Sequence, residues 1–87
     1  MIDIAYRVID IEIEALSNLK VNLGESFSQC INKILELDSR VVMCGMGKSG
    51  IIAKKVAASL ASTGTSSFYM HPGEAYHGDL GMIKQGD

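Results

Sequence analysis

The segment RVVMCGMGKSG, residues 40–50, restricts the possible folds of this chain more than any other part of the sequence. Its apolar run, Val41–Cys44, has the length and the β-branched content of a strand buried in a parallel sheet. Gly45, Gly47 and Gly50 follow at once, and such glycines let the backbone turn tightly with its N–H groups uncovered. The segment therefore predicts a strand that ends in a glycine-rich turn.

The residues after this turn, Ile51–Leu60, have helical character. A strand, a glycine turn and a helix N-terminus together form an anion site, because unpaired N–H groups and the positive end of the helix dipole converge there. Lys48 adds a full positive charge to the turn. We therefore predict that the chain binds a phosphorylated small molecule at this turn, or descends from a protein that does.

The spacing of the turn argues against two familiar phosphate motifs. Gly45–Gly50 fits the dinucleotide fingerprint G-x-G-x-x-G, but that motif also needs an acidic residue about 20 positions later, at the tip of the second strand. Here the second apolar run, Phe68–Met70, ends in His71, and the first acid is Glu74. A Walker A loop would need its first glycine at Val42. Neither a dinucleotide nor a nucleoside triphosphate is the expected ligand.

Composition limits the remaining choices. A length of 87 residues allows at most one small domain, and a net charge of −2 argues against binding to nucleic acid or to a membrane surface. The sequence contains no apolar run of membrane-spanning length and no signal-peptide pattern. Cys30 and Cys44 lie within apolar patterns, which indicates reduced core thiols in a cytoplasmic protein. A disulfide or a metal-binding pair is the alternative for these cysteines.

Apolar residues at helical spacing predict two helices before residue 40. The first helix has an apolar stripe up to a break at Asn22–Gly24: Ile4, Val8, Ile11, Ala15, Leu16 and Leu19. Ile9 and Ile13 widen this stripe, so we expect the helix to pack on two sides. Ser26 is expected to cap the second helix, whose inward-facing residues are Phe27, Cys30, Ile31, Ile34 and Leu35.

A second strand is predicted at Ser67–Met70, and the right-handed crossover rule makes it parallel to the first. The loop that follows starts at the carboxyl end of this strand, where open parallel sheets bind their ligands. It contains His71, His77, Glu74 and Asp79. From spacing alone, the histidines either hydrogen-bond to loop backbone or belong to the site. His71 precedes proline directly, and we expect it to fix the loop.

The motifs GMGKSG, ASTGT and HPGEAYHGDLGM resemble the sugar-isomerase (SIS) domain of bacterial arabinose 5-phosphate isomerases. The resemblance covers residues 40–87, expected to be the N-terminal half of a SIS domain, and residues 1–39 fit the N-terminal helical region of that family. It implies an α/β fold in which helices precede the first β-α-β unit of a parallel, three-layer, flavodoxin-like sheet. It also implies isomerisation of ribulose 5-phosphate and arabinose 5-phosphate, for the Kdo sugar of lipopolysaccharide.

The resemblance also implies roles for particular residues. Lys48 falls on the catalytic lysine of the family, and Ser49 falls on its phosphate-loop serine. The substrate-binding residues are thus expected to be Gly45, Gly47, Lys48, Ser49, Gly50 and His77. The family places His77 at the active site, where divalent zinc can bind. No cofactor is expected to be required, and zinc is expected to act as an inhibitor.

The sequence departs from the family at a few positions. Ile51 stands where histidine is common, which affects the substrate pocket, and Ser66 stands where proline is common, which is a structural difference. Family members continue with a third strand, a serine-rich S-x-S-G-x-[ST] loop, further catalytic helices and a pair of CBS domains. We therefore expect this chain to be the N-terminal part of an isomerase, inactive alone and homo-oligomeric as a whole, with a tetramer typical of the family.

Other interpretations of the sequence remain. In one of them, the chain is a non-catalytic module that binds a sugar phosphate, since SIS domains also serve as sensors. Alternatively, it would be a remnant that acts only through association with other subunits. The acidic N-terminal helix does not resemble the helix-turn-helix region that a regulator would carry.

Overall fold

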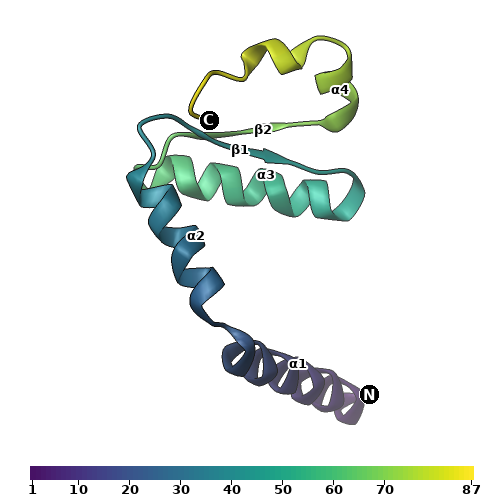
Figure 1. The fold of residues 1–87 in the computed structure, drawn as a ribbon. Helices are drawn as coiled ribbons and strands as arrows, with labels where there is room; N and C mark the ends of the chain where they lie inside the picture. Colours follow the sequence, from purple (N-terminus) through teal and green to yellow (C-terminus); the bar gives the residue numbers. More distant parts are fainter. The chain divides into compact units, whose positions relative to one another are not determined.

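The computed structural model describes residues 1–87, and the chain divides into two compact units, residues 1–31 and 32–87. The first unit contains helix α1 (Ile2–Asn22) and the start of helix α2 (Glu25–Glu36). The second unit contains the end of α2 and the rest of the chain (Figure 1). The two predicted N-terminal helices are therefore confirmed.

The predicted cap and the predicted packing of these helices are wrong in detail. Helix α2 begins at Glu25, with the Phe27 N–H donating to the Gly24 carbonyl at 3.0 Å, so Ser26 lies inside the helix instead of capping it. Neither α1 nor α2 contains a buried residue. Leu35, which was expected to face inward, is 74% exposed. Each helix has its apolar residues at helical spacing, but no other element of its own unit covers them.

The second unit is built on a parallel β-α-β arrangement, as predicted. Strands β1 (Val41–Cys44) and β2 (Ser67–Met70) have the expected bounds and pair in parallel, from Val41 opposite Ser67 to Cys44 opposite Met70. Helix α3 (Gly47–Ser62) connects them and lies along one face of the two-stranded sheet (Figure 1). The fold is thus α/β, with α1 and α2 preceding the first β-α-β unit.

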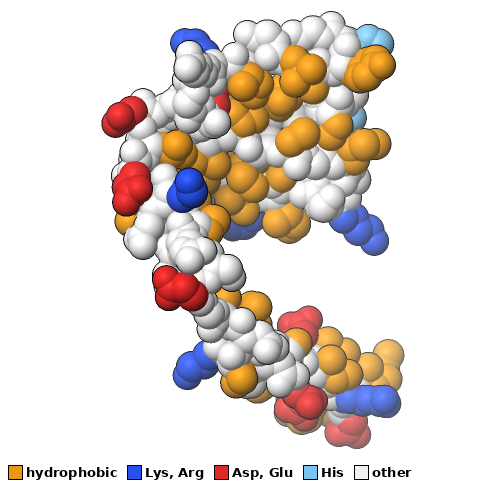
Figure 2. Space-filling model, in the orientation of Figure 1, with side chains coloured by type: hydrophobic (Ala, Val, Ile, Leu, Met, Phe, Trp, Pro, Cys, Tyr) orange, Lys and Arg blue, Asp and Glu red, His pale blue; other side chains and the backbone are white.

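Small residues allow α3 to approach the sheet closely. Its buried residues are Gly50, Ala53 and Ala57, whereas Ile52 and Val56 lie on exposed surface. The buried hydrophobic residues of the whole chain are Ala53, Ala57, Met70 and Ala75. Since a core of this size leaves most side chains uncovered, Figure 2 shows hydrophobic groups over much of the visible surface.

The segment after β2 forms helix α4 (Pro72–Tyr76) and the 3-10 helix η1 (Asp79–Met82), and it lies on the opposite side of the sheet from α3 (Figure 1). Its end returns to the start of β1. The Asp87 carboxylate accepts hydrogen bonds from the Ser39 hydroxyl and the Arg40 N–H, and it pairs with the Arg40 guanidinium at 2.9 Å. This contact connects the two ends of the second unit.

The prediction that both cysteines are core thiols is wrong in one respect. Cys30 and Cys44 are free thiols, but both are exposed. The apolar pattern around Cys30 belongs to a helix with no buried residue, and Cys44 is the last residue of β1, at its carboxyl end. None of the helices combines the length and the apolar composition that crossing a bilayer requires.

Candidate functional site: the glycine turn and the loop after β2

The register of the sheet brings the glycine turn and the histidine loop to the same edge. Cys44 and Met70 are paired as the last residues of β1 and β2, so Gly45 and His71 are the first residues beyond the carboxyl ends of the strands. Ligands of open parallel sheets bind at this edge. The candidate residues of these two segments therefore lie beyond the same ends of the two strands.

The helix after the turn begins earlier than the sequence indicated, at Gly47 instead of Ile51. Its first backbone bond runs from the Gly50 N–H to the Met46 carbonyl, at 3.1 Å. The N–H groups of Gly47, Lys48 and Ser49 belong to the first turn, where no preceding helical carbonyl is available to accept from them. These N–H groups are directed toward the N-terminal end of α3, where the helix dipole favours an anion.

Glycine is required at Gly45 and Gly50 because the two backbones touch. A Cβ atom built on Gly50 would lie 2.5 Å from the Gly45 carbonyl oxygen and 2.9 Å from its carbon. A Cβ on Gly45 would lie 3.2 Å from the Gly50 Cα and N atoms. Gly47 has a different reason, since its φ of +60° is unfavourable for residues with a side chain. The three glycines thus close the turn onto the first turn of α3.

The polar side chains of the turn are accessible to a ligand. Lys48 and Ser49 are both exposed, and Lys48 makes no ion pair in the structure. The Ser49 hydroxyl donates to the Met46 carbonyl at 2.8 Å, which leaves its oxygen lone pairs accessible. An ammonium group and N–H donors at a helix N-terminus suit a phosphate group.

A tyrosine that the sequence analysis overlooked supports the turn from β2. The Tyr69 hydroxyl donates a hydrogen bond to the Gly45 carbonyl, and the Lys54 ammonium lies 5.1 Å from the centroid of the Tyr69 ring. Tyr69 pairs with Met43 in the sheet, so its ring projects from a fixed position. The signal was weak, because a tyrosine in a strand is ordinary in packing terms.

The two histidines of the loop have different environments. His71 caps α4: its Nδ1 accepts a hydrogen bond from the Gly73 N–H at 2.9 Å, which confirms the expectation that it fixes the loop. His77 is the C-cap residue of α4, and its own N–H donates to the Glu74 carbonyl at 3.1 Å. Its imidazole is exposed and has no hydrogen bond or ion pair to the glycine turn.

No group of three or more His, Cys, Asp or Glu residues lies close enough together to hold a metal ion. His77 therefore does not form a complete metal site with other residues of this chain.

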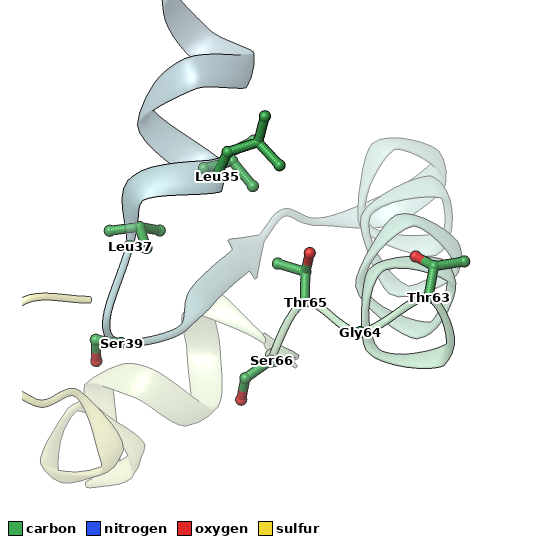
Figure 3. Close-up of a pocket in the computed structure, with 8 residues that line it drawn as sticks. Leu35, Leu37, Ser39, Thr63, Gly64, Thr65 and Ser66 are labelled. Atoms are coloured by element: carbon green, nitrogen blue, oxygen red, sulfur yellow. The ribbon is translucent and has the colours of Figure 1, made fainter.

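A cavity at the opposite edge of the sheet is a separate feature. It has a volume of about 430 Å³ and lies beside the N-terminal ends of the strands (Figure 3). Leu35, Leu37 and Ser39 line one side of it, and the segment 63–66 lines the other. Its lining contains hydroxyl groups but no charged side chain, so it lacks the cation that the glycine turn supplies.

These features define an α/β domain with a candidate anion site at the N-terminus of α3, beyond the carboxyl ends of two parallel strands. Residues 34–87 match the SIS domain family, and this chain belongs to that family.

Curated proteins with similar sequences carry a more specific description. The chain is 52% identical to arabinose 5-phosphate isomerase GutQ of Escherichia coli K12 over 88% of its length, which corresponds to 24% of GutQ. It is 49% identical to arabinose 5-phosphate isomerase KdsD of Pseudomonas aeruginosa over 95% of its length, or 26% of KdsD. The chain thus spans about a quarter of the length of these relatives.

A solved structure shares the fold. A protein of Escherichia coli CFT073 in complex with A5P superposes with a TM-score of 0.86 at 41% identity. The match covers 99% of this chain and 46% of that one. At 41% identity, the two proteins are similar in sequence as well as in fold.

Proposed function

We propose that this chain supplies the phosphate-binding part of an arabinose 5-phosphate isomerase, which interconverts ribulose 5-phosphate and arabinose 5-phosphate as a precursor step for Kdo and lipopolysaccharide. The observation that carries the proposal is the glycine turn, where uncovered N–H groups and Lys48 meet at the start of α3. Support also comes from the identity with GutQ and KdsD and from the structure solved with A5P. We further propose that residues 40–87 form the N-terminal half of the SIS domain, after a helical region at residues 1–39.

In this proposal each residue of the turn has a separate role in binding the sugar phosphate. The N–H groups of Gly47, Lys48 and Ser49 hold the phosphate, and the Ser49 hydroxyl turns from the Met46 carbonyl to donate to a phosphate oxygen. Gly45 and Gly50 hold the turn in shape by their backbone contact. His77 lies at the end of α4 and contacts the sugar.

Lys48 has the catalytic role in this proposal. Isomerisation between aldose and ketose moves a proton between C1 and C2 through an enediol or enediolate, and negative charge develops on the carbonyl oxygen. A lysine ammonium group at the site stabilises that charge. Glu74 and Asp79 are the carboxylates of the segment after β2, and the proposal assigns no base to either of them.

The remaining parts of the proposal concern zinc, assembly and location. We propose that zinc inhibits the enzyme with His77 as one ligand, completed by groups from outside this chain, since the chain holds no full ligand set. His77→Ala is then expected to weaken zinc inhibition, and unchanged inhibition would remove His77 from that role. We also propose a homo-oligomeric, cytoplasmic enzyme with no cofactor, no nucleic-acid partner and no membrane partner.

A chimera tests the proposed activity. The 77 residues that match E. coli GutQ replace the corresponding segment of that enzyme, and interconversion of ribulose 5-phosphate and arabinose 5-phosphate is measured in both directions. Turnover within about tenfold of GutQ is expected, given the retained turn. A folded chimera that binds arabinose 5-phosphate without turnover would instead favour a sugar-phosphate-binding module, and a folded chimera that does not bind it would contradict the proposal.

A further inference from the structure

The His-Pro-Gly sequence at residues 71–73 forms one compact unit at the end of β2. The His71 Nδ1 accepts from the Gly73 N–H at 2.9 Å, while the His71 carbonyl accepts from the Ala75 N–H at 2.9 Å. Pro72, at the start of α4, has no N–H group that would need a partner. His71 therefore supplies the acceptors for two N–H groups at the start of α4, those of Gly73 and Ala75.

The backbone of Gly73 lies close to the His71 imidazole. A Cβ atom on Gly73 would lie 3.0 Å from the His71 Nδ1 and 3.1 Å from its Cε1. A side chain at this position would therefore push the imidazole away from the N–H that it caps. The close approach follows from the hydrogen bond between the ring and the Gly73 N–H, and it leaves little room for a side chain at this position.

Helix α4 is anchored at one end by this unit and leads directly to His77. Met70, just before the unit, and Ala75, inside the helix, are 7% and 8% exposed. His77 follows as the C-cap residue, held by its N–H bond to the Glu74 carbonyl. Because α4 is only five residues long, the place of His77 depends on how its first turn is fixed.

We infer that His71 is a positioning residue for the sugar phosphate site: its Nδ1 fixes the start of α4 and thereby holds His77 at the carboxyl edge of the sheet. This inference rests on the proposed function. In this inference, His71 itself does not contact the substrate. The neutral ring carries its proton on Nε2, since Nδ1 is the acceptor.

The cap itself is tested on the full chain by hydrogen exchange of the Gly73 amide. In His71→Ala the exchange rate is expected to rise about five- to tenfold, the usual effect of losing an N-cap acceptor. His71→Asn restores a side-chain acceptor and is expected to recover most of the protection. Equal exchange in wild type and His71→Ala would overturn the cap, whatever the activity of the enzyme.

The positioning role is tested in the GutQ chimera with the same variants. His71→Ala is expected to raise the KM for arabinose 5-phosphate about five- to tenfold, with kcat changed less than about twofold, and His71→Asn is expected to restore the KM. Gly73→Ala should reproduce the effect, and the double variant should be no worse than either single one. Tyr76→Ala, an exposed residue of the same helix, serves as the control.

The outcomes separate this inference from the proposed function. An active chimera whose KM is unchanged in His71→Ala would overturn the positioning role and leave the proposed function standing. A folded wild-type chimera with neither binding nor turnover would overturn both. A KM that rises in His71→Ala but is not restored by asparagine would show that the ring has a role other than capping, and would overturn the inference.

Discussion

At the scale of single residues, the geometry of the glycine turn depends on residues without a side chain. Gly45 and Gly50 touch through their backbones, and this contact brings the strand end against the start of α3. Lys48 is the opposite case, an exposed side chain with no structural partner. The two kinds of residue therefore predict different phenotypes on substitution.

Substitution of Gly50 by alanine is expected to destabilise the fold. The new Cβ would lie 2.5 Å from the Gly45 carbonyl oxygen, so backbone must move, at a cost of about 1–3 kcal/mol. Thermal unfolding of the full chain measures the effect. Gly81→Ala is the matched control, because a Cβ at Gly81 meets nothing within 4 Å. Equal stability of the two variants would mean that the turn is not closed as described.

Substitution of Lys48 by alanine is expected to remove activity without loss of stability. A charge-stabilising group contributes about 10²–10³-fold to kcat, whereas an exposed lysine without a partner contributes little to folding. Isomerisation and thermal unfolding of the GutQ chimera test the two halves together. Lys55→Ala, an exposed lysine of the same helix, is the control, and retained activity in Lys48→Ala would remove Lys48 from the site.

At the scale of secondary structure elements, the strands were predictable and the burial of the helices was not. Both strands have the bounds that the apolar runs indicated, because glycine and proline delimit each run locally. The start of α3 was placed too late, since a glycine such as Gly47 resembles a turn residue even in a first helical turn. The burial of α1 and α2 depends on what packs against them, and periodicity carries no information on that.

The site was predictable to the same extent. The sequence places Lys48 and the glycines together because the turn is contiguous, and it places His71 in the loop, whereas their role at a site stays a prediction. The Tyr69 bond to Gly45 was missed, because the two residues are far apart in sequence and only the strand register brings them together. The Arg40–Asp87 pair was missed for the same reason, at a separation of 47 residues.

This ion pair predicts a pH dependence of stability. Hydrogen bonds from the Lys84 N–H, the Ser39 hydroxyl and the Arg40 side chain hold the pKa of Asp87 well below its usual value. Since folding lowers this pKa, the pair stabilises the fold above the unfolded carboxyl pKa of about 3.9, and the stabilisation is lost as the pH falls through the lower folded pKa.

The variant Asp87→Asn tests this dependence. It is expected to have a lower Tm than wild type at pH 7, and the difference is expected to shrink as the pH falls below about 4. Asp38→Asn is the control, because Asp38 has no hydrogen bond or ion pair in the structure. A Tm difference between Asp87→Asn and wild type that is constant with pH would contradict the assignment.

At the scale of the whole chain, uncovered apolar surface is the dominant property. Helix α1 has exposed isoleucines along its length, among them Ile9 and Ile13, which are 52% and 56% exposed. The sheet has only two strands, so each strand has an unpaired edge. Such patches and edges favour association with other chains.

The 87-residue chain by itself is therefore expected to associate and to lack isomerase activity. Lys48 is the only catalytic group that the proposal assigns to this chain, and effective catalysis needs several groups held in one geometry. Sedimentation velocity and an isomerase assay of the purified chain test both expectations. Ile9→Glu should reduce association, while Asp10→Lys, among the charged residues outside the apolar stripe of α1, should not. A monomer with clear turnover would contradict both expectations.

The most direct test of the central claim is a crystal structure of the GutQ chimera with arabinose 5-phosphate bound. The phosphate oxygens are expected within about 2.7–3.2 Å of the N–H groups of Gly47, Lys48 and Ser49, with the sugar toward His77. A phosphate bound elsewhere, for example in the cavity lined by Ser39 and Thr65 at the opposite edge of the sheet, would contradict the claim that the glycine turn is the anion site.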